Sequence, residues 1–200
     1  MKKLILLTLV FISTLFANDK SNHISEVYLQ SYNYEYIGKY DEAIKVLIPL
    51  YEKYTKGYTL NLRLGYLFFL SKKYKNAEIY YKKALLVLPS SVEAQLGLIK
   101  IKMMLKEYED VQILAYCILK VDYYNYYGNL YAIESLIAQK KYDTALEIIN
   151  KMLALYPTDV AFLEKRVIVY KHTKSKYFNE ACQSVKILDP NNVVVNRLEC

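Results

Sequence analysis

The stretch that decides the fold is residues 58–91, YTLNLRLGYLFFLSKKYKNAEIYYKKALLVLPSS. In its first half, four apolar residues recur at the spacing of one helix face: Leu60, Leu64, Leu67 and Phe68. A basic turn follows, then a second helical pattern that Pro89 stops, because proline lacks the backbone donor a helix interior needs. The stretch therefore predicts two helices, about residues 59–71 and about residues 75–88, which pack antiparallel.

The same pattern returns every 34 residues. A tyrosine occupies four positions at this spacing: Tyr40, Tyr74, Tyr108 and Tyr142. Three residues after each tyrosine comes a small or branched apolar residue: Ala43, Ala77, Val111 and Ala145. A constant period of this size is typical of a helical solenoid, in which each helix pair buries its apolar face against the next pair.

Residues 58–91 resemble a tetratricopeptide repeat. They match that family's signature at six places: Leu64-Gly65, Phe68, Ala77, Tyr81, Ala84 and Pro89. The resemblance extends over about residues 24–190 and implies an all-α, right-handed helical-repeat solenoid of about five antiparallel helix pairs. The expected units are residues 24–57, 58–91, 92–125, 126–159 and 160–190, followed by a C-terminal capping helix in residues 191–200.

Three features depart from a regular repeat. Pro49 falls inside the second helix of the first unit, so we expect a kink there. Ile99 and Ile133 occupy the position of Gly65, and we therefore expect the helices of those units to pack at a wider separation or at a different angle. The second helix of the last unit, about residues 179–188, is roughly one turn short.

The N-terminus has the pattern of a secretory signal peptide. Lys2 and Lys3 precede an apolar run over residues 4–17. A helix of this length reaches about 21 Å at ~1.5 Å per residue, which is short of a ~30 Å hydrocarbon core. We therefore expect cleavage after Ala17, a short linker over residues 18–23, and no integral membrane span in the mature chain. We therefore expect an exported protein, located either in the periplasm or in the extracellular medium.

Composition and charge limit the classes of protein and of partner that come into question. The chain has 200 residues, 23 tyrosines and no tryptophan, with a formal net charge of +7 that falls to +5 without Lys2 and Lys3. The remaining positive residues are scattered, and an exported protein does not normally meet nucleic acid, so we expect no nucleic-acid partner. The 54% hydrophobic content excludes a disordered chain.

No arrangement of residues points to catalysis. His23 and His172 have no metal-ligand spacing to each other, to cysteine or to paired carboxylates. The five glycines are dispersed, so no phosphate-binding loop is present. We expect neither an enzyme nor a metal or cofactor site.

Cysteine use leaves one question open. Cys117 follows an apolar helix column, and we expect a buried thiol there. Cys182 and Cys200 flank the last short helix and the cap in a chain expected to meet oxidising conditions. They can form a disulfide or remain two thiols.

The resemblance implies a partner site. In this family the first helix of each unit lines an inner groove that holds a peptide or a helix. Carrying over those positions gives a groove rich in tyrosine and leucine: Tyr28, Tyr32, Tyr36, Leu62, Tyr66, Phe69, Leu96, Lys100 and Met103. We expect a protein or peptide partner for this groove, although the same side chains can instead pack between units. The alternative function is a structural subunit of a cell-envelope assembly, joined through its terminal repeats.

Overall fold

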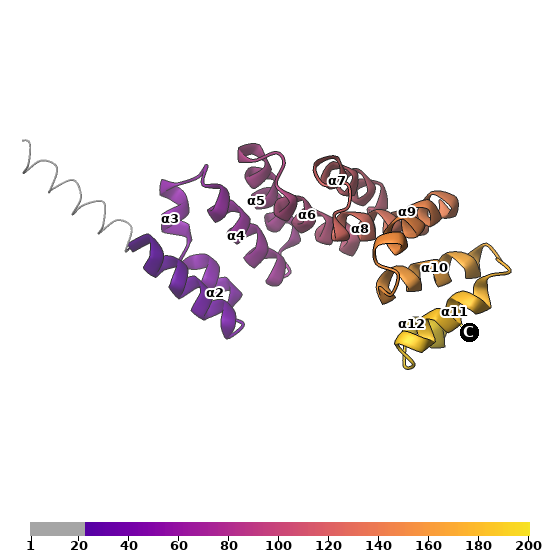
Figure 1. The fold of residues 1–200 in the computed structure, drawn as a ribbon. Coiled ribbons are helices and arrows are strands. Elements are labelled where there is room, and N and C mark those ends of the chain that lie inside the picture. Colours follow the sequence, from indigo (N-terminus) through magenta and orange to yellow (C-terminus); the bar gives the residue numbers. More distant parts are fainter. Residues whose placement is uncertain (1–22) are drawn as a thin grey trace, which may run out of the picture. The chain divides into compact units, whose positions relative to one another are not determined.

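The computed structural model describes residues 23–200, and every regular element in this range is a helix (Figure 1). The predicted signal peptide and nearly all of the expected linker lie outside the described residues, while His23 already belongs to the first helix. Among residues 23–200, no helix is both long enough and apolar enough to cross a bilayer. The predicted all-α fold of consecutive helix pairs is confirmed.

The chain divides into two compact units, Met1–Ala94 and Gln95–Cys200, and each is described by itself. The first contains a helix at residues 23–36, α2 (Tyr40–Lys45), α3 (Ile48–Lys53), α4 (Tyr58–Leu70) and α5 (Tyr74–Val87). Helix α6 (Val92–Leu105) begins in the first unit and continues into the second. The second then contains α7 (Tyr108–Val121), α8 (Tyr126–Ala138), α9 (Tyr142–Leu155), α10 (Val160–His172), α11 (Phe178–Leu188) and α12 (Val193–Arg197).

The periodic apolar column forms the core, as the sequence predicts. Four residues of this column are fully buried, each three positions into the second helix of its pair: Ala43, Ala77, Val111 and Ala145. The tyrosine that opens each of these helices is half-buried. Cys117 differs from expectation, because its side chain is half-buried and not fully enclosed.

Gly65 shows why α4 and α5 can approach so closely. A Cβ atom at this position would lie 2.8 Å from Cδ1 of Tyr81, whose ring is almost completely buried. Only a residue without a side chain leaves room for that ring. The close approach of α4 and α5 therefore depends on a glycine that faces a large aromatic side chain.

The connection inside each helix pair repeats in its backbone as well as in its sequence. One residue of each turn has a positive φ, between 53° and 73°: Gly38, Lys72, Lys106, Lys140 and Lys174. After α4, the N–H of Lys73 donates to the carbonyl of Phe68 (2.9 Å) and the N–H of Lys72 to that of Phe69 (3.0 Å). This hydrogen-bond pattern terminates an α-helix and reverses the chain within a few residues.

The second helix of the first pair is interrupted at Pro49, where the sequence predicts only a kink. Helix α2 ends at Lys45, and α3 begins at Ile48 with Pro49 in its first turn. Proline cannot donate to a carbonyl four residues earlier, and it is tolerated in the first turn of a helix, where donors are free anyway. One expected helix is therefore two short ones.

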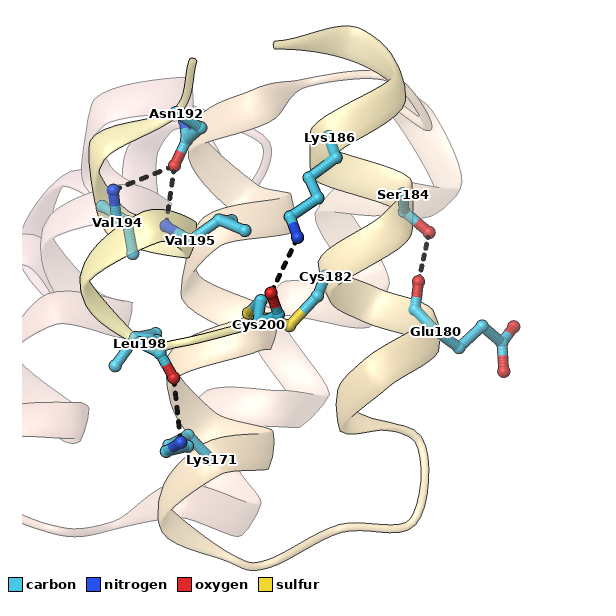
Figure 2. The surroundings of a disulfide bond; sticks show 10 residues. All are labelled: Lys171, Glu180, Cys182, Ser184, Lys186, Asn192, Val194, Val195, Leu198 and Cys200. Carbon is cyan, nitrogen blue, oxygen red and sulfur yellow. Dashed lines mark hydrogen bonds between the residues drawn. A yellow bond between two sulfur atoms is a disulfide. The ribbon is translucent and has the colours of Figure 1, made fainter. Parts of the chain in front are cut away.

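Helix α12 closes the C-terminal end of the second unit (Figure 2). It packs against α10 and α11 and buries Val195 in the core of that unit. The Asn192 side chain accepts hydrogen bonds from the N–H groups of Val194 and Val195 (3.0 and 3.1 Å), which caps the helix. The segment expected to form a cap is thus helical over five residues.

Three further contacts hold the end of the chain. A disulfide joins Cys182 of α11 to Cys200, with an S–S distance of 2.04 Å and a Cα–Cα distance of 5.7 Å. As Figure 2 shows, the Lys186 ammonium donates to the Cys200 carbonyl (2.7 Å), and the Lys171 ammonium donates to that of Leu198 (2.9 Å). The last residues are therefore fixed both covalently and by hydrogen bonds.

Candidate partner-binding site

A hollow lined with tyrosines opens in the first unit, between the helix at residues 23–36 and α4. Its volume is about 640 Å³. The residues around it come from those two helices and from the start of α2: Tyr32, Asn33, Glu35, Tyr36, Tyr40, Arg63, Tyr66 and Leu70. We call it the tyrosine pocket.

A buried ion pair forms one side of the tyrosine pocket. Arg63 is only 7% exposed, and its guanidinium donates to the half-buried carboxylate of Glu35. A second guanidinium nitrogen donates to the Ser31 hydroxyl (3.1 Å), and Ser31 is completely buried. Because a buried cation must be paired and hydrogen-bonded, these contacts fix the arginine in one position.

The same guanidinium lies over a tyrosine ring. The central carbon of the Arg63 guanidinium is 3.9 Å from the centre of the Tyr32 ring, at the distance of a cation–π contact. Tyr32 is thus held from one side, while 52% of its surface remains exposed. The pocket therefore presents a ring that has few conformations left to lose when a ligand arrives.

Tyr66 faces the same carboxylate. Burial, together with the charge of Glu35 and a hydrogen bond to it, raises the pKa of Tyr66 above the ordinary value. Its hydroxyl donates to the Glu35 carboxylate. With Arg63 and Glu35 compensating each other, the tyrosine pocket combines an aromatic wall with no net charge.

The structure brings only part of the predicted groove together. Tyr32, Tyr36 and Tyr66 line the tyrosine pocket, and Tyr36 is almost free of the protein, with 91% of its surface exposed. The other predicted residues of the first unit, Tyr28, Leu62 and Phe69, are half-buried and do not line it. Burial raises the pKa of Tyr28. The ring of Phe69 instead packs on Tyr74, with 5.7 Å between ring centres.

The remaining predicted groove residues lie on α6, in the second unit. Lys100 is exposed, whereas Leu96 and Met103 are half-buried. Lys100 is thus accessible to solvent, whereas part of the Leu96 side chain is buried against neighbouring residues.

Arg63 and its pairing with Glu35 were not identified from the sequence. Neither follows the 34-residue period, since they lie 28 residues apart on different repeats. One signal was present, because Arg63 is the single charged residue in the thirteen of α4. A lone charge in an apolar helix needs a partner, and Glu35 supplies it.

Metal binding finds no support in the described part of the chain. Among residues 23–200, no group of three or more histidine, cysteine, aspartate or glutamate side chains comes close enough to hold an ion.

No protein-family model matches the chain, and no curated protein matches it in sequence. Solved structures do match its fold. A tetratricopeptide repeat protein from Parabacteroides merdae superposes with a TM-score of 0.81 at 17% identity, over 87% of this chain and 70% of that chain. MamA from Desulfovibrio magneticus gives a TM-score of 0.76 at 13% identity, over 84% of this chain and 96% of that chain.

A third structure, YrrB, is described as a TPR protein with an unusual peptide-binding site. It superposes with a TM-score of 0.74 at 11% identity, over 86% of this chain and 90% of that chain. At such identities the likeness concerns the fold. The 34-residue period, the consecutive helix pairs and these superpositions agree: the chain folds as a tetratricopeptide repeat protein.

Proposed function

We propose that this chain is an exported, non-catalytic interaction scaffold that binds a peptide or a helix of a partner protein on the first helices of its pairs. The observation that carries the proposal is the tyrosine pocket. Proteins with this fold include one described as having a peptide-binding site, which supports a partner of the same kind here.

The chemistry of the tyrosine pocket favours a protein ligand. Tyrosine provides a large, rigid contact area together with a hydroxyl, and it is enriched where binding energy is concentrated. The pocket is electrically neutral, because the charge of Arg63 is balanced by Glu35. A neutral aromatic pocket suits an apolar or aromatic side chain of a partner segment better than a polyanion.

Contacts already present in the free protein reduce the cost of binding. Arg63 holds the Tyr32 ring, and Glu35 accepts from Arg63 and Tyr66. Side chains that are ordered beforehand lose less conformational entropy when a ligand arrives. We therefore assign the main contact to Tyr32 and Tyr66, and we expect the exposed ring of Tyr36 to add contact surface beside them.

Assembly through the terminal repeats is the less favoured alternative. Helix α12 covers the apolar end of the last pair and is tied down by the Cys182–Cys200 disulfide. A capped end presents little apolar surface for stacking another unit. An assembly of this kind has to use the N-terminal end of the chain.

The proposal is tested by selecting binding peptides from a random displayed library and measuring their affinity for two variants. Tyr32→Ala combined with Tyr66→Ala removes both walls of the pocket and should weaken binding at least tenfold, since truncating a buried aromatic anchor costs about 2 kcal/mol or more. Helical content is measured alongside by circular dichroism.

The matched control changes charge on α5 and leaves the pocket intact. Lys75→Ala with Lys82→Ala is suitable, because both lysines are exposed. Lys83 is unsuitable, since its ammonium donates to the Tyr51 hydroxyl (2.6 Å). Peptides that bind the folded tyrosine variant as tightly as the control variant would remove the tyrosine pocket from the proposal.

Export is tested separately by the intact mass of the protein recovered from the source cell. The mature chain should begin at Asn18. A product that retains Met1 outside the cytoplasm contradicts signal-peptide cleavage.

A further inference from the structure

A small hollow lies between α10 and α11 in the second unit, and the proposed peptide-binding function does not use it. Its volume is about 190 Å³, below the range of about 300–1,000 Å³ that is usual for sites of drug-sized ligands. The residues that line it come from α10, from the turn and from α11: Arg166, Tyr170, Tyr177, Glu180, Ala181 and Ser184. We call it the arginine hollow.

An arginine in this hollow occupies the position of a core residue. At spacings of 34 residues, Arg166 is equivalent to three apolar residues of the earlier helix pairs: Leu64, Leu98 and Ala132. Those three are buried, whereas Arg166 is half-buried. Its Nε atom is buried without a hydrogen-bond partner, and within residues 23–200 its guanidinium belongs to no ion pair. Because a cation withdrawn from water needs a partner, the position calls for an anionic group from outside.

A small side chain opens the hollow. Ser184 lies six residues after the start of α11, where the earlier second helices carry large side chains: Tyr80, Leu114 and Ile148. In the pair of α4 and α5, the Tyr80 ring stacks on Phe68, with 5.2 Å between ring centres and 11° between ring planes. Tyr170 takes the position of Phe68 in the last pair, but Ser184 provides no ring to stack on it. The space that a ring fills in α4 and α5 is therefore left to a ligand.

The turn before α11 supplies another wall. In the three preceding pairs, the second helix begins two residues after the left-handed lysine, at Tyr74, Tyr108 and Tyr142. Helix α11 begins four residues after Lys174, so the last turn is two residues longer. Tyr177 lies in this longer turn, and its ring centre is 6.2 Å from that of Tyr170. The arginine, the serine and the longer turn all depart from the repeat at one place, which favours a site that the earlier pairs lack.

A second unpaired charge lines the hollow. Glu180 is exposed, and within residues 23–200 its carboxylate belongs to no ion pair, with Arg166 or with any other residue. Its backbone carbonyl accepts a hydrogen bond from the Ser184 hydroxyl (3.1 Å), and both residues lie on the side of α11 that faces away from the disulfide (Figure 2). The hollow thus combines one free cation with one free anion.

We propose that the arginine hollow binds a free α-amino acid with an apolar side chain. The carboxylate of the ligand pairs with the Arg166 guanidinium, and its ammonium pairs with the Glu180 carboxylate. Its side chain lies against the Tyr170 ring, as Tyr80 lies against Phe68 in the pair of α4 and α5. A guanidinium suits the first contact, because its planar donors match the two oxygens of a carboxylate.

Other ligands leave one of the two charges unmatched. Glu180 repels a phosphate or a polyanion, and Arg166 repels a polyamine. The end of a peptide provides either a carboxylate or an ammonium group, and a longer peptide segment exceeds the volume of the hollow. A free amino acid carries both charges on neighbouring atoms and is small enough to enter.

Isothermal titration calorimetry of the purified chain with L-phenylalanine tests the proposal. Two analogues each lack one charge: N-acetyl-L-phenylalanine has no ammonium group, and L-phenylalanine amide has no carboxylate. Each should bind at least about tenfold more weakly than L-phenylalanine, because each leaves one charge of the hollow unpaired.

Two results with these ligands overturn the proposal. If L-phenylalanine does not bind at millimolar concentration, water alone hydrates Arg166. If N-acetyl-L-phenylalanine binds as tightly as L-phenylalanine, the hollow recognises a lone carboxylate such as the C-terminus of a protein.

Three variants locate the binding. Arg166→Leu removes the cation and introduces the residue that α4 and α6 bury at the same position. Ser184→Tyr keeps both charges and fills the hollow with the side chain that α5 carries there. Glu180→Gln removes the anion from an exposed position. Each should weaken L-phenylalanine binding at least about tenfold, while circular dichroism shows unchanged helical content.

The matched control is Arg197→Leu, which removes an exposed arginine of α12 that does not line the hollow. This variant should bind L-phenylalanine as tightly as the wild-type protein. Undiminished binding in folded Arg166→Leu or Ser184→Tyr, or an equal loss in the control variant, contradicts binding in the arginine hollow.

Discussion

The chemistry of the tyrosine pocket depends on one buried cation. Arg63 contacts Glu35, Ser31 and the face of Tyr32, and its Nε atom is buried with no hydrogen-bond partner in the described chain. Burying such a group costs free energy. In return, the arginine holds three neighbouring side chains in place at once. The arginine therefore acts as a positioning residue for the aromatic wall.

A double-mutant cycle tests this role. Arg63→Leu leaves the half-buried Glu35 carboxylate without its cation, and we expect a loss of about 3 kcal/mol in the free energy of unfolding. Arg63→Leu with Glu35→Leu removes both charges and should recover most of that loss. The measurement is urea unfolding followed by circular dichroism. Glu35→Leu alone is measured as well. If the losses in the free energy of unfolding of the two single variants add up to the loss of the double variant, the residues are not coupled and the ion pair does not order the pocket.

Three tyrosines of the pocket, Tyr32, Tyr36 and Tyr66, could be predicted from the sequence, but the ion pair at its side could not. Tyr32 and Tyr66 occupy equivalent positions of consecutive repeats, so a periodic pattern is enough to place them on one face. The contact between Glu35 and Arg63 joins non-equivalent positions and depends on the packing between two helices. Periodicity carries no information about such a contact.

At the scale of the helices, the sequence predicts most helix boundaries, because the residues that stop helices and the spacing of the apolar residues indicate the same ends. The expected helices at residues 59–71 and 75–88 appear as Tyr58–Leu70 and Tyr74–Val87. The first pair is the exception, since Pro49 splits the second helix instead of bending it. A proline in the sequence indicates that one backbone hydrogen bond of the helix is lost, but whether the helix bends or breaks depends on the surrounding packing.

The turns contain a feature that sequence patterns do not show. Four of the five left-handed positions are lysines, where glycine has the lower conformational cost. These lysines recur every 34 residues in the sequence, but only the backbone dihedral angles show that they adopt the left-handed conformation.

The C-terminal helix gives a prediction at the same scale. If Cys182 and Cys200 are joined in solution, thiol titration of the denatured, non-reduced protein should find one free thiol per chain, that of Cys117. Three free thiols would exclude the bond. In the chain-entropy model, closing a loop of 18 residues contributes about 3 kcal/mol, so reduction should lower the free energy of unfolding by a similar amount.

At the scale of the whole chain, those tyrosines whose pKa is raised in the folded state make stability sensitive to alkaline pH. Burial, followed by a hydrogen bond to Asp159, raises the pKa of Tyr126 to about 12. Burial also raises the pKa of several other tyrosines: Tyr28, Tyr66, Tyr80, Tyr81 and Tyr131. The folded state therefore retains protons that the unfolded chain releases near pH 10.

The sign of the pH effect follows directly. Where the folded state binds more protons than the unfolded state, stability falls as pH rises. We expect the urea midpoint to be steady below pH 10 and to decrease between about pH 10 and pH 12. Tyr126→Phe should make that decrease shallower. A midpoint that stays constant across this range would show that these hydroxyls titrate alike in both states.

The central claim is that the tyrosine pocket binds a partner segment, and Tyr36→Ala tests it most directly. Tyr36 is 91% exposed, so its removal should leave the free energy of unfolding unchanged within about 0.5 kcal/mol, as expected for a surface substitution. The measurement is the dissociation constant of a library-selected peptide for the wild-type and variant proteins. A rise of at least tenfold is the predicted result, whereas an unchanged dissociation constant in an equally stable variant contradicts binding in the tyrosine pocket.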